Sequence, residues 1–197
     1  MVGIETEIKF AVTEQARLEA RLLALGFEVT TPRSFESNVL FDTAGRTLRA
    51  RRELVRIRSY AGRTIVTHKC VPPSGIGEDR HKHRVETETE VADGQAIAEI
   101  LRAAGLEPAF RYEKWRTEFS DGRGHCVVDE TPIGVFAELE GSPEWIDSAA
   151  AALGVPDEAR MTLSYGRLFD IWRERMGTAV TDLTFEAVQR ADASSES

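Results

Sequence analysis

The 197-residue sequence predicts an α+β fold in which about eight antiparallel strands close into a barrel and helices pack outside it. Strand-length segments of the chain alternate between apolar and charged side chains, and amphipathic helical segments separate them. The charged faces of the strands carry too many charges for a dry core. We therefore expect the interior of the barrel to be wet, with its positive and negative charges nearly balanced.

The alternation is simplest in the first predicted strand, 3–10. Successive side chains of a strand point to opposite faces, so Glu5, Glu7 and Lys9 share one face while apolar residues occupy the other. A helix is predicted over 14–25, with Thr13 as its N-cap and Gly26 as its stop. Extended segments follow near 27–31 and 35–42, and a short helical piece near 46–51.

Two further strands, near 53–60 and 63–71, flank a hairpin turn at Ala61-Gly62. A Pro- and Gly-rich loop covers 72–77. The longest alternating strand follows at 81–91, and its charged face carries Lys82, Arg84, Glu86, Glu88 and Glu90. Asp93 is the predicted N-cap of a second helix, 94–104, which Gly105 ends.

Strands near 109–119, 124–130 and 134–141 complete the barrel, with Asp121-Gly122 as a hairpin turn. Helices are predicted over 143–153 and 163–176. We assign residues 1–178 to one barrel domain and residues 179–197 to a C-terminal tail, disordered from Asp192 onward.

Charges of one sign recur at a spacing of two, and the strands sort by that sign. Carboxylates pair in segments such as Glu138-x-Glu140, and cations pair in segments such as Arg56-x-Arg58 and Lys114-x-Arg116. An ordinary wet outer face is the alternative, but it would mix in Ser, Asn and Gln, and like charges on one face repel. Metal ions suit the carboxylates, and phosphate oxygens suit Lys and Arg. The set as a whole therefore favours a ligand-binding function.

Composition narrows the class of partner. The formal net charge is −8, which makes general binding to nucleic acid or to an anionic membrane a poor hypothesis. Basic strands within an acidic chain indicate a small anionic ligand. Two cysteines give neither a disulfide framework nor a zinc signature. Without a signal peptide or an apolar run of membrane length, we expect a cytoplasmic protein, and the sequence leaves a homodimer open.

The ordered motifs resemble those of the CYTH superfamily, the triphosphate tunnel metalloenzymes. The resemblance covers about residues 3–176 and rests on this series: Glu5-x-Glu7-x-Lys9, Phe41-Asp42-Thr43, Arg56-x-Arg58, Thr67-x-Lys69, Arg84-x-Glu86-x-Glu88, Lys114-x-Arg116, Asp129, Phe136-x-Glu138-x-Glu140 and Ser164-Tyr165. It implies an eight-stranded antiparallel tunnel in which basic residues grip a triphosphate and glutamates hold Mg²⁺ or Mn²⁺. Relatives include inorganic triphosphatases, thiamine triphosphatases and class IV adenylyl cyclases.

The resemblance implies a role for each charged residue. Triphosphate would be bound by Lys9, Arg56, Arg58, Lys69, Arg84, Lys114 and Arg116. Metal would be bound by Glu5, Glu7, Asp129, Glu138 and Glu140. The catalytic candidates, which would place a second metal or the attacking water, are Glu86, Glu88 and Glu90. The chain departs from the family pattern at Pro72, which stands one place late, and it shows neither a tandem Trp motif nor an adenine-reading motif.

We therefore expect an enzyme that hydrolyses a triphosphate, either inorganic tripolyphosphate or an organic triphosphate, and releases orthophosphate. Such chemistry needs neutralised phosphate charge and an aligned water. One alternative is a class IV-type adenylyl cyclase, in which the ribose 3′-oxygen is the nucleophile. Another is a non-catalytic polyphosphate- or nucleotide-binding module, which would need the cations but not the full set of glutamates.

Overall fold

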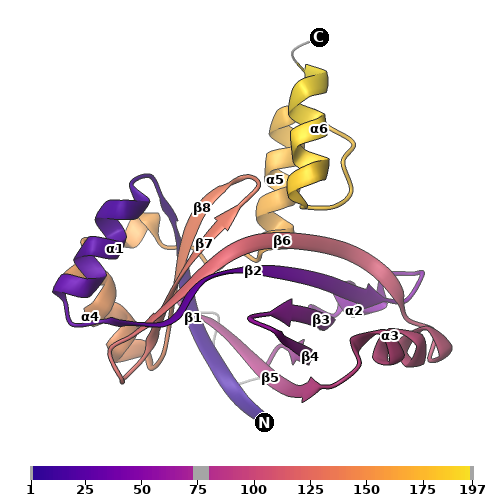
Figure 1. Cartoon of the computed structure of the whole chain (residues 1–197), viewed down its shortest axis with the longest axis horizontal. Coiled ribbons are helices and arrows are strands. Elements are labelled where there is room, and N and C mark those ends of the chain that lie inside the picture. The colour runs from indigo at the N-terminus through magenta and orange to yellow at the C-terminus, as the bar shows by residue number, and fades with distance from the viewer. Residues whose placement is uncertain (1, 73–79, 196–197) are drawn as a thin grey trace.

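The computed structural model describes residues 2–72 and 80–195, so the loop predicted at 72–77 lies outside the described residues from position 73. Within these ranges the strands form a closed antiparallel barrel in the order β1-β5-β4-β3-β2-β6-β7-β8 (Figure 1). The strands are β1 (Val2–Val12), β2 (Glu28–Asp42), β3 (Leu54–Tyr60), β4 (Arg63–Cys70), β5 (Lys82–Val91), β6 (Glu107–Ser120), β7 (His125–Thr131) and β8 (Gly134–Glu140). The predicted fold class is confirmed.

The helices lie outside the barrel. They are α1 (Gln15–Ala24), α2 (Thr47–Ala50), α3 (Gly94–Ala103), α4 (Pro143–Leu153), α5 (Tyr165–Met176) and α6 (Phe185–Ser195), with a 3₁₀ turn at Asp157–Ala159. Asp93 caps α3 as predicted, because its side chain accepts a hydrogen bond from the backbone N–H of Ala96 at 2.9 Å. Helix α6 lies in the region predicted as a tail, where the sequence indicated no helix.

Strand β2 is continuous, although two separate extended segments were predicted. Its pairing with β6 shifts register between Val29 and Thr31 and again between Thr31 and Ser34. Pro32 lies within the second shift, where its missing backbone N–H needs no ladder partner. The bulges therefore let one long strand bend around the barrel in place of two short ones.

Three apolar clusters attach the helices to the outer wall. Helices α1 and α4 lie together on one side, where Leu22 and Ile146 are buried with Phe119 of β6 (Figure 1). Helix α3 covers β3 and β4, with Ala98 packed near Ile57. Since these contacts use the apolar face of each strand, they direct the opposite, charged face inward.

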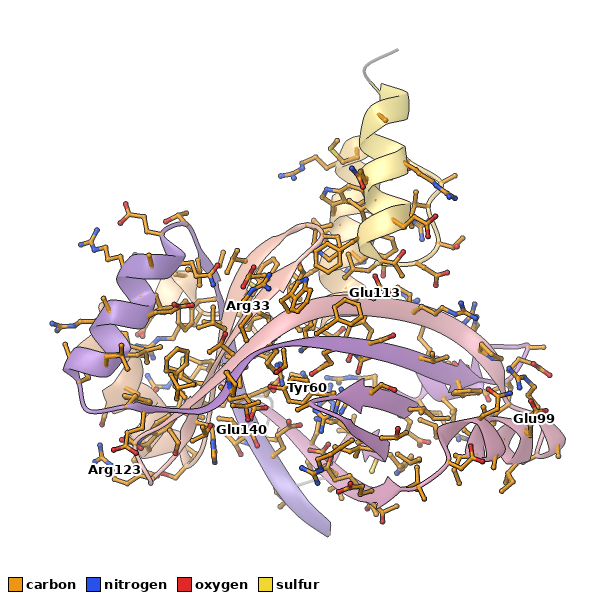
Figure 2. All side chains as sticks on the ribbon, viewed as in Figure 1. Arg33, Tyr60, Glu99, Glu113, Arg123 and Glu140 are labelled. Atoms are coloured by element: carbon orange, nitrogen blue, oxygen red, sulfur yellow. The ribbon has the colours of Figure 1, made fainter. Side chains whose placement is uncertain are left out.

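The third cluster holds the C-terminal pair of helices, which projects from the barrel in Figure 1. Phe169 of α5 and Leu183 of the connection are buried beside Tyr112 of β6. Below this pair, Glu113 lies on β6 (Figure 2) and accepts a hydrogen bond from the backbone N–H of Phe185 at 3.1 Å. None of the helices among the described residues has both the length and the apolar character needed to cross a bilayer.

Candidate active site

The interior of the barrel is lined by charged side chains, and the strand register decides which of them meet. Cross-strand neighbours include Glu7 with Glu140, Lys9 with Glu138, Lys69 with Glu86, Glu36 with Lys114, and Arg116 with Asp129. Burial is extensive, since Lys9 is 2% exposed and Asp129 is fully buried. The sequence therefore places opposite charges side by side across strands, although like charges follow one another along each strand.

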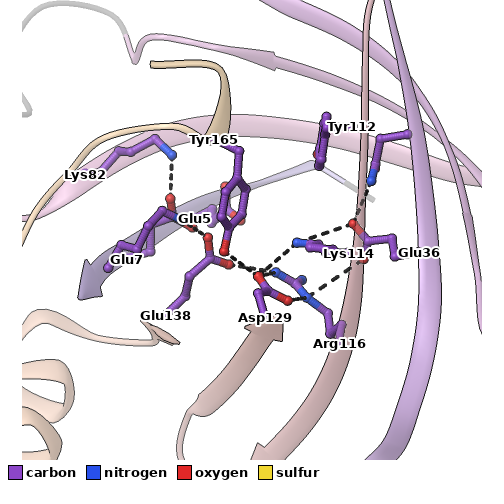
Figure 3. A network of polar contacts seen from close by, with 12 residues as sticks. Glu5, Glu7, Glu36, Lys82, Tyr112, Lys114, Arg116, Asp129, Glu138 and Tyr165 are labelled. Carbon is purple, nitrogen blue, oxygen red and sulfur yellow. Dashed lines mark hydrogen bonds and ion pairs between the residues drawn. The ribbon is translucent and has the colours of Figure 1, made fainter. Parts of the chain in front are cut away.

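Four glutamates, which we call the carboxylate group, gather on one side of the interior: Glu5, Glu7, Glu138 and Glu140 (Figure 3 shows the first three). Lysines neutralise most of them. The ammonium of Lys69 lies 2.5 Å from a Glu5 oxygen and 3.2 Å from Glu86. The remaining ion pairs join Lys82 to Glu7 and Lys9 to Glu138.

The carboxylate group is crowded. Although Glu140 reaches solvent, the surrounding protein removes part of its hydration, and together with the charges of Glu5 and Glu7 this raises the pKa of Glu140 to about 7. Burial and the charge of Glu7 raise the pKa of Glu5. The pKa of Glu138 is instead held well below its usual range, because Lys9 and Arg116 outweigh the effect of its burial.

This donor set fits a divalent cation chemically, since four carboxylates lie on neighbouring strands and two of them have raised pKa values. Over residues 2–72 and 80–195, however, no three His, Cys, Asp or Glu side chains are arranged to enclose an ion as they stand. Lysines hold the carboxylates instead. Metal binding by Glu5, Glu7, Glu138 and Glu140 stays a prediction.

Four cations, which we call the cation group, come from β3 and β6 and act on the Glu36 carboxylate: Arg56, Arg58, Lys114 and Arg116. The guanidinium of Arg116 donates to both oxygens of Asp129, at 2.7 and 2.6 Å, and to Glu138 at 2.8 Å. Burial opposes the charge of Arg116, but Asp129 and its other anionic neighbours outweigh it and raise the pKa of Arg116 well above its usual value. Arg116 therefore stays charged in the ligand-free protein.

Asp129, predicted as a metal ligand, is the anchor of the cation group. Besides Arg116, it accepts a hydrogen bond from Lys114 at 2.9 Å and one from the Tyr165 hydroxyl at 2.6 Å. The Tyr165 ring lies 3.9 Å from the Lys9 ammonium and 4.7 Å from that of Lys114. Helix α5 thus contributes a side chain to the interior, and the predicted metal role of Asp129 stays untested.

The remaining candidates extend from this network, since Arg58 belongs to the cation group and Arg84 lies opposite Glu5 across the β1–β5 pair. Arg58 approaches Glu88 at 3.5 Å, and the Arg84 side chain donates to the backbone carbonyl of His83 at 2.7 Å. Glu90 is half exposed and pairs with Arg63 at 2.8 Å, close to the Ala61-Gly62 turn. Of the three predicted catalytic glutamates, Glu86 lies closest to the carboxylate group through Lys69.

Glu36 and Lys82 are charged interior residues that were not predicted as site residues. Glu36 of β2 is fully buried and lies 3.3 Å from the Lys114 ammonium. Lys82 was assigned to the charged face of its strand but given no role. For Glu36 the only available signal was parity, because Glu36 and Asn38 share a face opposite Phe35. A single carboxylate beside an amide does not repeat the like-charge pattern, so it was overlooked.

The chain is thus a closed antiparallel barrel whose largely buried interior carries ionised side chains of both signs. The CYTH domain family matches residues 3–152, which is most of the chain. The protein belongs to the CYTH family. Members of this family are enzymes, adenylyl cyclases and triphosphatases among them, and generally use divalent metal ions.

Individual relatives agree with this assignment. A Methanocaldococcus jannaschii protein provisionally named an adenylate cyclase is 27% identical over 140 residues, covering 71% of this chain and 77% of its own. A Vibrio parahaemolyticus structure with the same provisional name has a TM-score of 0.71 at 21% identity, covering 85% of this chain and 98% of its own. A Hippeastrum structure, provisionally named an adenylyl cyclase and described as having a dominant triphosphatase activity, has a TM-score of 0.58 at 18% identity, covering 89% and 96%.

Proposed function

We propose that this protein is a metal-dependent triphosphatase that hydrolyses inorganic tripolyphosphate or an organic triphosphate and releases orthophosphate. The observation that carries the proposal is the joint presence, inside one barrel, of four cations on β3 and β6 and four carboxylates on β1 and β8, with Arg116 and Glu138 in contact between the two groups. Phosphoryl transfer depends mainly on positioning and charge neutralisation, and this arrangement supplies both. The net charge of −8 favours a small anion over nucleic acid or a membrane as the partner.

In this proposal the cations bind the phosphates. Arg56 and Arg58 offer planar guanidinium groups that suit two phosphate oxygens at once. Lys114 and Arg116 flank them, and Lys9, Lys69 and Arg84 extend the row toward the carboxylate group. Because Lys9 and Lys69 are now paired with Glu138 and Glu5, an incoming phosphate would exchange one anionic partner for another.

The carboxylate group would hold Mg²⁺ or Mn²⁺. A divalent ion bound there would neutralise phosphate charge and polarise the bond that breaks. Glu86 or Glu88 would orient an attacking water, a role supported by the position of Glu86 beside Lys69 and of Glu88 beside Arg58. Glu90 lies at the exposed end of the charged face of β5, so it is the least favoured of the three predicted catalytic glutamates.

A class IV-type adenylyl cyclase is the second candidate, favoured by the names of the Methanocaldococcus and Vibrio relatives. The same cations would bind ATP, and the ribose 3′-oxygen would attack the α-phosphorus and displace pyrophosphate. The triphosphatase is preferred because the Hippeastrum relative, despite its cyclase name, is described as mainly a triphosphatase. A binding module without catalysis is the third candidate.

Incubation with tripolyphosphate, thiamine triphosphate and ATP, each with Mg²⁺ and with Mn²⁺, tests the proposal. Wild-type protein should release orthophosphate from at least one of them. Glu7→Gln removes one charge from the carboxylate group at nearly constant size, so it should abolish metal-dependent turnover. Glu28→Gln, an exposed change on β2, is the matched control and should retain activity. Binding without any product under either metal would support the module instead.

A further inference from the structure

Glu36 is an anion placed within the cation group. Its carboxylate lies 3.3 Å from the Lys114 ammonium and 3.8 Å from the Arg116 guanidinium. Figure 3 shows Lys114 and Arg116 between two carboxylates, Glu36 on one side and Asp129 on the other. Its side chain is fully buried, so bulk water does not screen it.

The Glu36 carboxylate is ionised at neutral pH. Burial opposes its ionisation, but Lys114, Arg116, Arg56 and Arg58 outweigh burial and lower the pKa of Glu36 to about 2. With a neutral side chain at position 36, the positive charges of these four cations would be less fully neutralised.

The carboxylate of Glu36 accepts fewer hydrogen bonds than that of Asp129. Both oxygens of Asp129 accept hydrogen bonds, whereas Glu36 accepts one, from the Asn38 amide to Oε1 at 2.9 Å. Among the described residues, Glu36 Oε2 is buried without a hydrogen-bond partner. Glu36 therefore acts on the cation group mainly through its negative charge and only to a small extent through hydrogen bonds.

We propose that Glu36 is an internal counter-ion that limits the affinity of the cation group for phosphate, so that the shortened product leaves the tunnel. The inference rests on the proposed function. A phosphate that reaches Arg56, Arg58, Lys114 and Arg116 must also approach a fixed negative charge. Two unit charges at such short range repel strongly at the low effective dielectric of a protein.

The direct test is Glu36→Gln, which removes the charge at nearly constant shape. Binding of pyrophosphate, the product left from tripolyphosphate, is measured by calorimetry in EDTA. The variant should bind it at least about tenfold more tightly than wild type, because one repulsive unit charge has been removed. Glu28→Gln changes the net charge by the same amount from the exposed end of β2 and should bind as wild type does.

A second variant covers the case in which Glu36→Gln fails to fold. Asn38→Asp adds a second carboxylate on the same face, next to Glu36 and opposite Arg58 across the β2–β3 pair. It should weaken pyrophosphate binding by about tenfold or more, for the same electrostatic reason. In steady-state turnover of tripolyphosphate, Glu36→Gln should lower both KM and kcat, as expected when product release becomes limiting.

The outcomes separate the two proposals. If wild type hydrolyses tripolyphosphate but Glu36→Gln binds pyrophosphate no more tightly than wild type, the counter-ion role is overturned and the triphosphatase stands. Weaker binding by Glu36→Gln would likewise overturn it, and would make Glu36 a residue that orients Lys114 and Arg116. If wild type binds neither pyrophosphate nor tripolyphosphate, both proposals fail.

Discussion

At the scale of single residues, the interior is organised by buried carboxylates that hold cations in place. Asp129 binds Lys114, Arg116 and Tyr165 at once, and none of its surface is exposed. Buried charges are stable only when paired and hydrogen-bonded, so Asp129 makes the buried cations tolerable in the ligand-free protein. In the proposed function, a substrate would bind cations that are already positioned.

Asp129→Asn should therefore destabilise the protein in the absence of any metal. Removing one partner of a buried ion pair costs about 3–5 kcal/mol, because the remaining charges stay buried without compensation. Urea unfolding in EDTA measures the loss. Glu140→Gln is the comparison, since this crowded carboxylate should change stability little or increase it. An Asp129→Asn variant as stable as wild type, but deficient in metal binding, would make Asp129 a metal ligand and not an anchor.

The pH dependence of stability tests the charge state of Glu36. Its pKa in the folded protein is about 2, below the ordinary value of 4.5. Its ionisation therefore stabilises the fold above about pH 4.5, and that contribution is lost as the pH falls toward 2. The shift corresponds to a contribution on the order of 3 kcal/mol.

Glu36→Gln lacks this contribution. The difference in unfolding free energy between wild type and variant should be largest near pH 6 and should shrink between pH 4.5 and pH 2. Urea titrations at a series of pH values measure it. A difference that stays constant across this window would mean that Glu36 is not ionised in the folded protein.

At the scale of elements, α5 and α6 complete the interior from outside the barrel. Leu183 forms a short bridge with Tyr112, and its N–H donates to the Arg111 carbonyl at 2.9 Å. Asp182 accepts a hydrogen bond from the Arg111 N–H at 2.8 Å. These bonds fix the connection to β6, while Phe169 and Val188 pack beneath it. The C-terminal pair is thereby held where Tyr165 reaches Asp129.

Leu183→Ala should test this attachment. Leu183 is fully buried, so truncation should cost about 2–5 kcal/mol through lost contacts and a cavity. Ile171→Ala on α5 is the control, because that side chain is 42% exposed and its loss should stay within about 0.5 kcal/mol. Both are measured by urea unfolding. Equal, small effects would show that the connection is not anchored to the barrel.

Alternation predicted the strands well because each has one apolar and one charged face, as in 81–91. The continuity of β2 was not predictable in the same way. Pro32 indicates the end of a strand in the sequence, whereas in the structure the strand continues through it with a shift of register. Helix α6 gave little signal, because its amphipathic face is short. The pairing of Arg116 with Asp129 depends on strand register, which a single sequence does not specify.

At the scale of the whole molecule, the barrel turns a polar surface inward and balances its charges. The sequence predicted a wet, nearly neutral interior, and Glu36 and Lys82, charged interior residues without a predicted role, add one charge of each sign. The balance therefore holds with them included. In the proposed function, a polyanion and its metal would replace internal ion pairs without leaving a net buried charge.

The proposed triphosphatase activity can be followed by phosphorus NMR of wild-type protein with tripolyphosphate and Mg²⁺, and in parallel with ATP. Wild type should convert tripolyphosphate to pyrophosphate and orthophosphate, while Glu7→Gln should leave it intact. Formation of cyclic AMP and pyrophosphate from ATP, with tripolyphosphate unchanged, would contradict the proposal and assign the protein to the cyclases.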